Sequence, residues 1–108
     1  MVKSEKFYRM LGLCTRAGAV AFGEGGVKDS IRGKTARLVI VADDGSDNTK
    51  KKFRNNCSFY SVPYFEHGDR FALGNATGRS FAVVLSITNK DLADSLIKIL
   101  NDSETDAL

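Results

Sequence analysis

Two runs of apolar residues mark the centre of the predicted sheet. Residues 37–42 (RLVIVA) and residues 81–87 (FAVVLSI) are almost continuously apolar. Apolar runs without alternation are typical of strands that are covered on both faces. Two shorter apolar stretches, at residues 19–22 and 61–65, predict further strands. Pro63 suits the start of the second of these, or an edge position.

Between these strands, apolar residues recur every three or four positions, which predicts helices. The pattern gives five helices, at residues 4–17, 25–32, 48–57, 68–74 and from residue 90 onward. We expect the side chain of Ser4 to cap the first helix and that of Asn89 to cap the last. Because helices alternate with strands, the sequence predicts an α/β protein, a three-layer αβα sandwich with a mostly parallel or mixed sheet of about four strands.

The chain of 108 residues has the length of one domain with a substantial core. We expect residues 1–101 to form this domain and the acidic residues 102–108 to be a flexible tail. No segment approaches the roughly 20 apolar residues of a membrane span, and the first residues lack the apolar core of a signal peptide. These features predict a cytoplasmic protein without a membrane partner, and we expect a monomer.

The sequence gives little support for catalysis or metal binding. Cys14, Cys57 and the single histidine, His67, do not have the spacing of metal ligands, and the hydroxyl side chains have no base to activate them. Asp43-Asp44 follow a predicted buried strand, where α/β enzymes often place carboxylates, but turn and capping chemistry is the favoured interpretation. We therefore expect no enzyme activity, no metal and no cofactor, with metal-dependent turnover at Asp43-Asp44 as the least favoured alternative.

Positive charge is concentrated in the first half of the chain. Residues 1–54 contain 12 Lys and Arg against 6 Asp and Glu, whereas residues 55–108 contain 4 against 7. This asymmetry favours a polyanionic partner on one face, although solvated helix and loop surface explains the charge alone about equally well. The three lysines at 50–52 would widen such a surface, but a solvated helix face is the favoured interpretation for them.

A glycine-rich segment is the strongest candidate binding site. Residues 22–33 (FGEGGVKDSIRG) predict a tight turn that leads into a short helix. Backbone N–H groups at a helix start, with a lysine one turn later, can hold a phosphate or a base edge. Lys28 and Arg32 are four residues apart and share one helix face. The segment completes neither a dinucleotide-binding motif nor a phosphate loop.

A second segment can contribute to the same site. The loop that contains Thr77, Gly78 and Arg79 is suited to contacting an unstacked RNA base. The predicted RNA-binding residues are Gly23, Glu24, Gly25, Gly26, Lys28, Arg32, Thr77, Gly78 and Arg79.

The order of elements and several motifs resemble the kink-turn-binding ribosomal protein superfamily. The motifs are the turn and helix that end in Lys28…Arg32-Gly33, the strand that runs into Ala42-Asp43-Asp44, the Val62-Pro63-Tyr64 strand, and Phe71-Ala72-Leu73-Gly74-Asn75-Ala76-Thr77-Gly78 with the apolar strand after it. The superfamily includes archaeal and eukaryotic large-subunit proteins and pelota-like RNA-binding domains. The resemblance covers residues 4–100 and is closest to the small bacterial YlxQ-type members.

This resemblance implies a non-enzymatic protein that recognises structured RNA of the kink-turn type, either ribosomal or another non-coding RNA, with the ribosome as a candidate partner. In the family, a glycine, an asparagine, a glutamate and a lysine at the helix start read sheared G·A pairs. Lys28 falls on the family lysine, whereas Glu24 stands at the asparagine and Gly25 at the glutamate. These differences leave an alternative, a protein-interaction module of the same fold in the translation machinery that has lost specific RNA readout.

Overall fold

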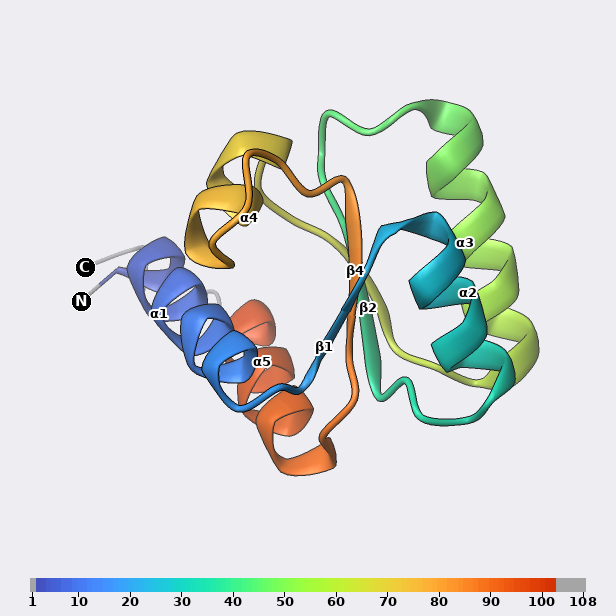
Figure 1. Cartoon of the computed structure of the whole chain (residues 1–108), viewed down its shortest axis with the longest axis horizontal. Helices are drawn as coiled ribbons and strands as arrows, with labels where there is room; N and C mark the ends of the chain where they lie inside the picture. Colours follow the sequence, from blue (N-terminus) through green and yellow to red (C-terminus); the bar gives the residue numbers. More distant parts are fainter. Residues whose placement is uncertain (1, 103–108) are drawn as a thin grey trace.

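The computed structural model describes residues 2–102, and within them the chain folds into five helices and one four-stranded sheet (Figure 1). In chain order, the elements are α1 (Lys3–Arg16), β1 (Val20–Phe22), α2 (Gly23–Arg32), β2 (Leu38–Val41), α3 (Asp47–Tyr60), β3 (Tyr64–Glu66), α4 (Arg70–Ala76), β4 (Val84–Ile87) and α5 (Lys90–Asn101). The predicted order of helices and strands is confirmed. None of these helices is long and apolar enough to cross a membrane. Residues 103–108 of the predicted tail lie outside the described residues.

The last strand of the sequence lies inside the sheet, whose order is β1-β4-β2-β3. β4 is antiparallel to both of its neighbours, so Leu85 lies opposite Phe22 on one side and opposite Ile40 on the other. β2 and β3 are parallel, with Val39 opposite Tyr64. The sheet is therefore mixed, which is one of the two predicted forms, and it is not mostly parallel.

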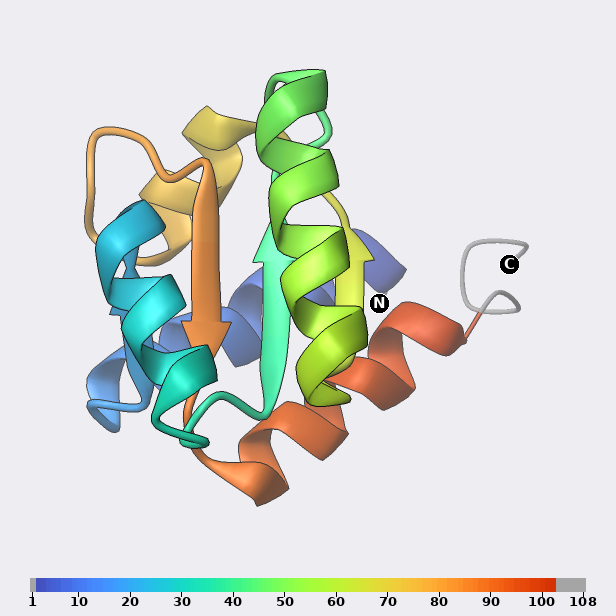
Figure 2. The same ribbon diagram turned by 90° about the vertical axis from the view of Figure 1, so that its right-hand side faces the viewer.

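Helices cover both faces of the sheet, which confirms the three-layer αβα sandwich (Figures 1 and 2). α1, α4 and α5 lie on one face, where Phe7, Leu73 and Leu96 are fully buried. α2 and α3 lie on the other face, where Val27 and Phe53 are fully buried. Because each face of the sheet has its own helical layer, β2 and β4 are buried along their whole length.

The helix ends agree with the predictions only in part. Asn89 caps α5 as predicted, because its side chain accepts a hydrogen bond of 3.0 Å from the backbone N–H of Leu92. Ser4 does not cap α1, so that prediction was wrong: the helix begins after Val2, and no side chain caps it. α3 continues beyond its predicted end to Tyr60.

α4 continues through Gly74 to Ala76 because this glycine serves packing and not helix termination. A Cβ atom on Gly74 would lie 2.5 Å from the Cα of Phe81, closer than any side chain tolerates. The segment before β4 therefore lies directly on the helix. There, the N–H of Arg79 donates to the carbonyl of Gly74 (2.8 Å), and the N–H of Ala82 donates to the carbonyl of Arg70 (2.9 Å). This packing fixes the position of the loop that carries Arg79.

Candidate nucleic-acid interface

The start of α2 and the segment before β4 enclose an open pocket with a volume of about 680 Å³. Phe22, Gly23 and Glu24 line one side, and residues 78–84 line the other. The pairing of β1 with β4 holds the two segments together, because Phe22 lies opposite Leu85 in the register of these strands. The structure thus brings together the two regions that the sequence predicted as binding segments.

The first turn of α2 consists mostly of glycines, so few side chains cover its backbone. The helix begins at Gly23, two residues earlier than predicted, so the glycines form its first turn and not a separate loop. Gly23, Gly25 and Gly26 are exposed, and a Cβ atom on any of them would meet no other group within 4 Å. No side chain caps the helix. Because the first backbone N–H groups of a helix lack internal partners and carry the positive end of its dipole, this surface is suited to an anion or a base edge.

Glu24 is held by α3. Its carboxylate forms an ion pair of 2.7 Å with Lys52 and accepts a hydrogen bond of 3.4 Å from the hydroxyl of Thr49. The hydrogen bond from Lys52 is the main reason why the pKa of Glu24 is lowered, with a further contribution from the charge of Lys28. The carboxylate stays ionised at neutral pH, but Lys52 balances its charge, which reduces its repulsion of a nearby phosphate.

Lys28 and Arg32 share one face of α2, as the sequence spacing predicts. They lie one turn apart on α2, Arg32 exposed and Lys28 half-buried. Among residues 2–102, the ion pairs involve neither of these two side chains. Both cations are therefore available to an anionic ligand, but neither lines the pocket, and Arg32 lies at the opposite end of α2 from the glycine turn.

A cation–π contact between Arg79 and Phe22 joins the two sides of the pocket. The guanidinium carbon of Arg79 lies 3.6 Å from the centroid of the Phe22 ring, in cation–π geometry. The side chain of Phe81 also lines the pocket and is 58% exposed. Our sequence predictions omitted both aromatic residues. The available signal was an aromatic residue close to each set of predicted binding residues, Phe22 before Gly23 and Phe81 two residues after Arg79.

Thr77, one of the predicted RNA-binding residues, is neither exposed nor part of the pocket lining. Thr77 is buried, and its hydroxyl donates to the carbonyls of Leu73 (2.8 Å) and Gly74 (3.1 Å). These are the last carbonyls of a helix, which need a donor when the helix ends in the interior. Thr77 therefore stabilises the end of α4 and does not belong to the surface, whereas the neighbouring Gly78 and Arg79 are exposed.

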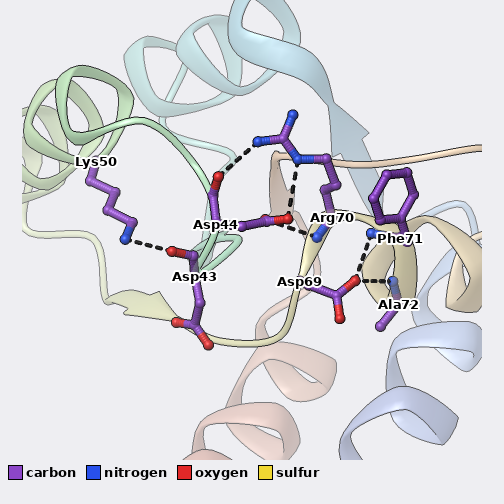
Figure 3. Close-up of polar contacts among 7 residues, drawn as sticks. All are labelled: Asp43, Asp44, Lys50, Asp69, Arg70, Phe71 and Ala72. Atoms are coloured by element: carbon purple, nitrogen blue, oxygen red, sulfur yellow. Dashed lines mark hydrogen bonds and ion pairs between the residues drawn. The ribbon is translucent and has the colours of Figure 1, made fainter.

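Asp44, the second residue of the Asp43-Asp44 pair, belongs to a structural clamp (Figure 3). The carboxylate of Asp44 accepts hydrogen bonds from the side-chain Nε (3.2 Å) and the backbone N–H (3.0 Å) of Arg70. The guanidinium of Arg70 also donates to the main-chain carbonyl of Asp44 (2.7 Å). Asp69 caps α4 beside this clamp. The clamp joins the loop after β2 to the start of α4, which supports the turn and capping interpretation.

Other reactive groups are buried or dispersed. Burial raises the pKa of the thiols of both Cys14 and Cys57 to about 11, so both stay protonated at neutral pH. In the part of the chain that the structure describes, no group of three His, Cys, Asp or Glu side chains is placed to hold a metal ion.

The fold and the pocket define a small αβα protein of ribosomal-protein type. The chain belongs to the ribosomal protein L7Ae/L30e/S12e/Gadd45 family, whose model matches residues 5–98. This confirms the predicted resemblance, and membership of the family agrees with the expectation that the protein is not an enzyme.

Two sequence relatives carry the same description. The chain is 38% identical over 96 residues to the RNA-binding protein YlxQ of Bacillus subtilis (strain 168), covering 89% of this chain and 96% of that protein. It is 44% identical over 62 residues to the RNA-binding protein YlxQ of Enterococcus faecium, covering 57% of this chain and 60% of that protein.

Solved structures agree with the fold. A protein of unknown function from Bacillus halodurans has a TM-score of 0.88 at 30% identity, with coverage of 90% of this chain and 98% of that chain. The Giardia lamblia 15.5kD RNA binding protein has a TM-score of 0.77 at 24% identity, with coverage of 94% and 88% respectively. At this identity, the second likeness supports the fold alone.

Proposed function

We propose that this protein binds structured RNA of the kink-turn type through the pocket between α2 and β4. The observation that carries the proposal is the convergence of two surfaces on one open pocket: the uncapped glycine turn of α2, and the loop with Arg79 and Phe81. The description of two sequence relatives as RNA-binding proteins supports RNA as the class of ligand. Ribosomal RNA or another non-coding RNA is the candidate partner.

The two sides of the pocket would contact different parts of the RNA. The bare turn of α2 offers backbone N–H groups to a phosphate or a base edge, and Lys28 and Arg32 extend this positive surface along the helix. Arg79 and Phe81 offer a guanidinium plane and an aromatic ring, on which an unstacked base can lie. A sharply kinked RNA presents both features, a closely approached backbone and an unstacked base, within a short distance.

Glu24 limits how the bases can be read. A carboxylate accepts hydrogen bonds but cannot donate them, so it cannot contact O6 or N7 of guanine. We infer that the guanine edges are read by Lys28 and by the backbone N–H groups of the glycine turn. Glu24 instead fixes the start of α2 against α3 through Lys52.

A titration with two RNAs tests the proposal. One RNA contains a kink-turn, and the other has the same helices but lacks the G·A pairs. We expect tighter binding of the kink-turn RNA in gel-shift or calorimetric measurements at fixed salt. Equal affinity for the two RNAs would refute specific recognition. Absence of binding to either would favour the alternative, a protein-interaction module of the same fold.

A further inference from the structure

An exposed aromatic pair lies at the end of the molecule opposite the pocket. Phe59 and Tyr60 form the last residues of α3, and their rings meet edge to face with centroids 4.9 Å apart. Phe59 is 81% exposed, the most exposed of the large apolar side chains in residues 2–102. α3 runs away from the pocket end, so the pair lies where β2 and β3 begin (Figure 2). A ring this exposed contributes little to the core.

Three cations lie nearby, one at the end of α2 and two on the connection that follows it to β2. Arg32, Lys34 and Arg37 are exposed, and the ion pairs within residues 2–102 leave all three unpaired. Lys34 has a left-handed backbone with φ of 63°, which a lysine adopts only at some cost. The connection therefore presents a concentrated positive charge.

The aromatic pair and these cations belong to the same edge of the molecule. β2 and β3 are parallel neighbours, and the N–H of Val39 donates to the carbonyl of Pro63 at 2.9 Å, just beyond both segments. In the interior, Ala36 packs in one cluster with Cys57 and Val62. The residues before β2 and those after α3 are thus held side by side. We call Arg32, Lys34, Arg37, Phe59 and Tyr60 the distal patch.

The charge of the distal patch exceeds what the helix ends require. α2 and α3 both end here, and the carboxyl end of a helix carries a partial negative charge. Arg32 lies in the last turn of α2 and compensates that helix. The last turn of α3 contains no basic residue. The three full positive charges of Arg32, Lys34 and Arg37 nevertheless exceed the partial charges of about −0.5 at the two helix ends, and this excess favours an anionic occupant.

Lys28 connects the distal patch to the pocket. It lies one turn before Arg32 on the same face of α2, about 6 Å along the helix axis. The ten residues of α2 span only about 15 Å in all. A nucleic-acid strand that leaves the pocket along this face of α2 would therefore pass Lys28 and Arg32 and reach the distal patch at the end of the helix.

We propose that the distal patch is a second RNA-binding surface, which binds a single-stranded extension of the RNA held in the pocket. The cations would contact phosphates, and a base would stack on the ring of Phe59. Cations combined with an exposed aromatic ring form the usual type of sequence-tolerant site for single strands. This inference rests on the proposed function, because the strand is taken to leave the pocket.

Titrations with three RNAs test this second surface. The first is a kink-turn hairpin with a flush end, the second is the same hairpin with an oligouridine extension, and the third carries the extension but lacks the G·A pairs. The variants are Phe59→Ala, Phe59→Trp and the double variant Lys34→Asn/Arg37→Gln, in which asparagine suits the left-handed backbone. Lys98→Gln, which removes one exposed positive charge on α5, is the control for loss of charge outside the distal patch.

The wild-type protein should bind the extended hairpin more tightly than the flush one. Phe59→Ala should weaken binding of the extended hairpin at least about fivefold, the lower limit for removing a base–aromatic stack, and leave the flush hairpin unaffected. Phe59→Trp should still bind the extended hairpin more tightly than the flush one, because tryptophan also offers an aromatic ring for stacking. The double variant should reduce the salt dependence by about 0.7 in log–log slope for each phosphate that it no longer neutralises. Lys98→Gln should behave as wild type.

Unchanged binding of the extended hairpin by Phe59→Ala would overturn the inference, as would an equal decrease for both hairpins. The inference also fails if the extension does not raise the affinity for the hairpin. If an oligoglutamate peptide then shifts the amide resonances of residues 33–37, the distal patch binds an acidic protein segment instead. If the extension raises affinity through Phe59 but the G·A pairs do not matter, the distal surface stands and kink-turn recognition fails. The two proposals are therefore tested separately.

Discussion

Replacing Gly74 by alanine sets two opposing effects against each other. In an unhindered helix, the change stabilises the fold by about 0.8–1 kcal/mol, because alanine is the better helix former. Here the added Cβ would lie 2.5 Å from the Cα of Phe81, 2.8 Å from its nitrogen and 2.9 Å from the carbonyl oxygen of Arg79. All three are main-chain atoms, so no side chain can rotate away. Overpacking typically costs about 1–3 kcal/mol, and three main-chain contacts below 3 Å place this site in the upper part of that range, at about 2–3 kcal/mol. After subtraction of the gain in helix propensity, we expect a net destabilisation of about 1–2 kcal/mol.

Urea unfolding followed by circular dichroism measures this change as a difference in the free energy of unfolding. Gly26→Ala is the matched control, because a Cβ at Gly26 meets nothing within 4 Å. We expect Gly26→Ala to be as stable as wild type or slightly more stable, but to bind RNA more weakly, since its methyl group covers the bare helix start. Gly74→Ala should lose both stability and RNA affinity, because the loop of Arg79 is displaced. Wild-type stability in Gly74→Ala would refute the proposed packing role.

Three further predictions concern the pocket. Lys28→Ala should weaken kink-turn binding by about 1–3 kcal/mol if the lysine reads a base, and wild-type affinity in a gel-shift titration would remove it from the site. Arg79→Ala should weaken binding by about 1–3 kcal/mol if a base stacks on its guanidinium above Phe22, whereas an unchanged dissociation constant in calorimetry would contradict that interaction. The Lys52 hydrogen bond lowers the pKa of Glu24 below its ordinary value of 4.5, so this pair stabilises the fold above about pH 4.5 and loses its effect as the pH falls through the folded-state pKa. The free energies of unfolding of wild type and Glu24→Gln in urea should therefore differ by less than about 1 kcal/mol at neutral pH, as expected for an exposed pair, and should become equal in acid. A difference that grows as the pH falls would contradict the stabilising role of the ionised carboxylate.

The local pattern of the sequence determined the elements and one face of the site. Continuous apolar runs identified β2 and β4, because a strand between two helical layers has no polar face. The side chain of Asn89 marked the start of α5, since capping depends on neighbouring residues alone. The spacing of Lys28 and Arg32 likewise placed both on one face of α2. All these features could be predicted because the residues that indicate them lie within a few positions of one another in the sequence.

Tertiary packing decided the features that depend on residues far apart in the sequence. β4 lies between β1 and β2, and this strand order brings the loop of Arg79 to the start of α2. Gly74 lies inside a helix because the chain returns to pack on it. Thr77 is buried because α4 ends in the interior, where the hydroxyl of Thr77 donates hydrogen bonds to the last carbonyls of the helix. Periodicity and propensity contain no information about these interactions, since they describe each segment without its neighbours in space.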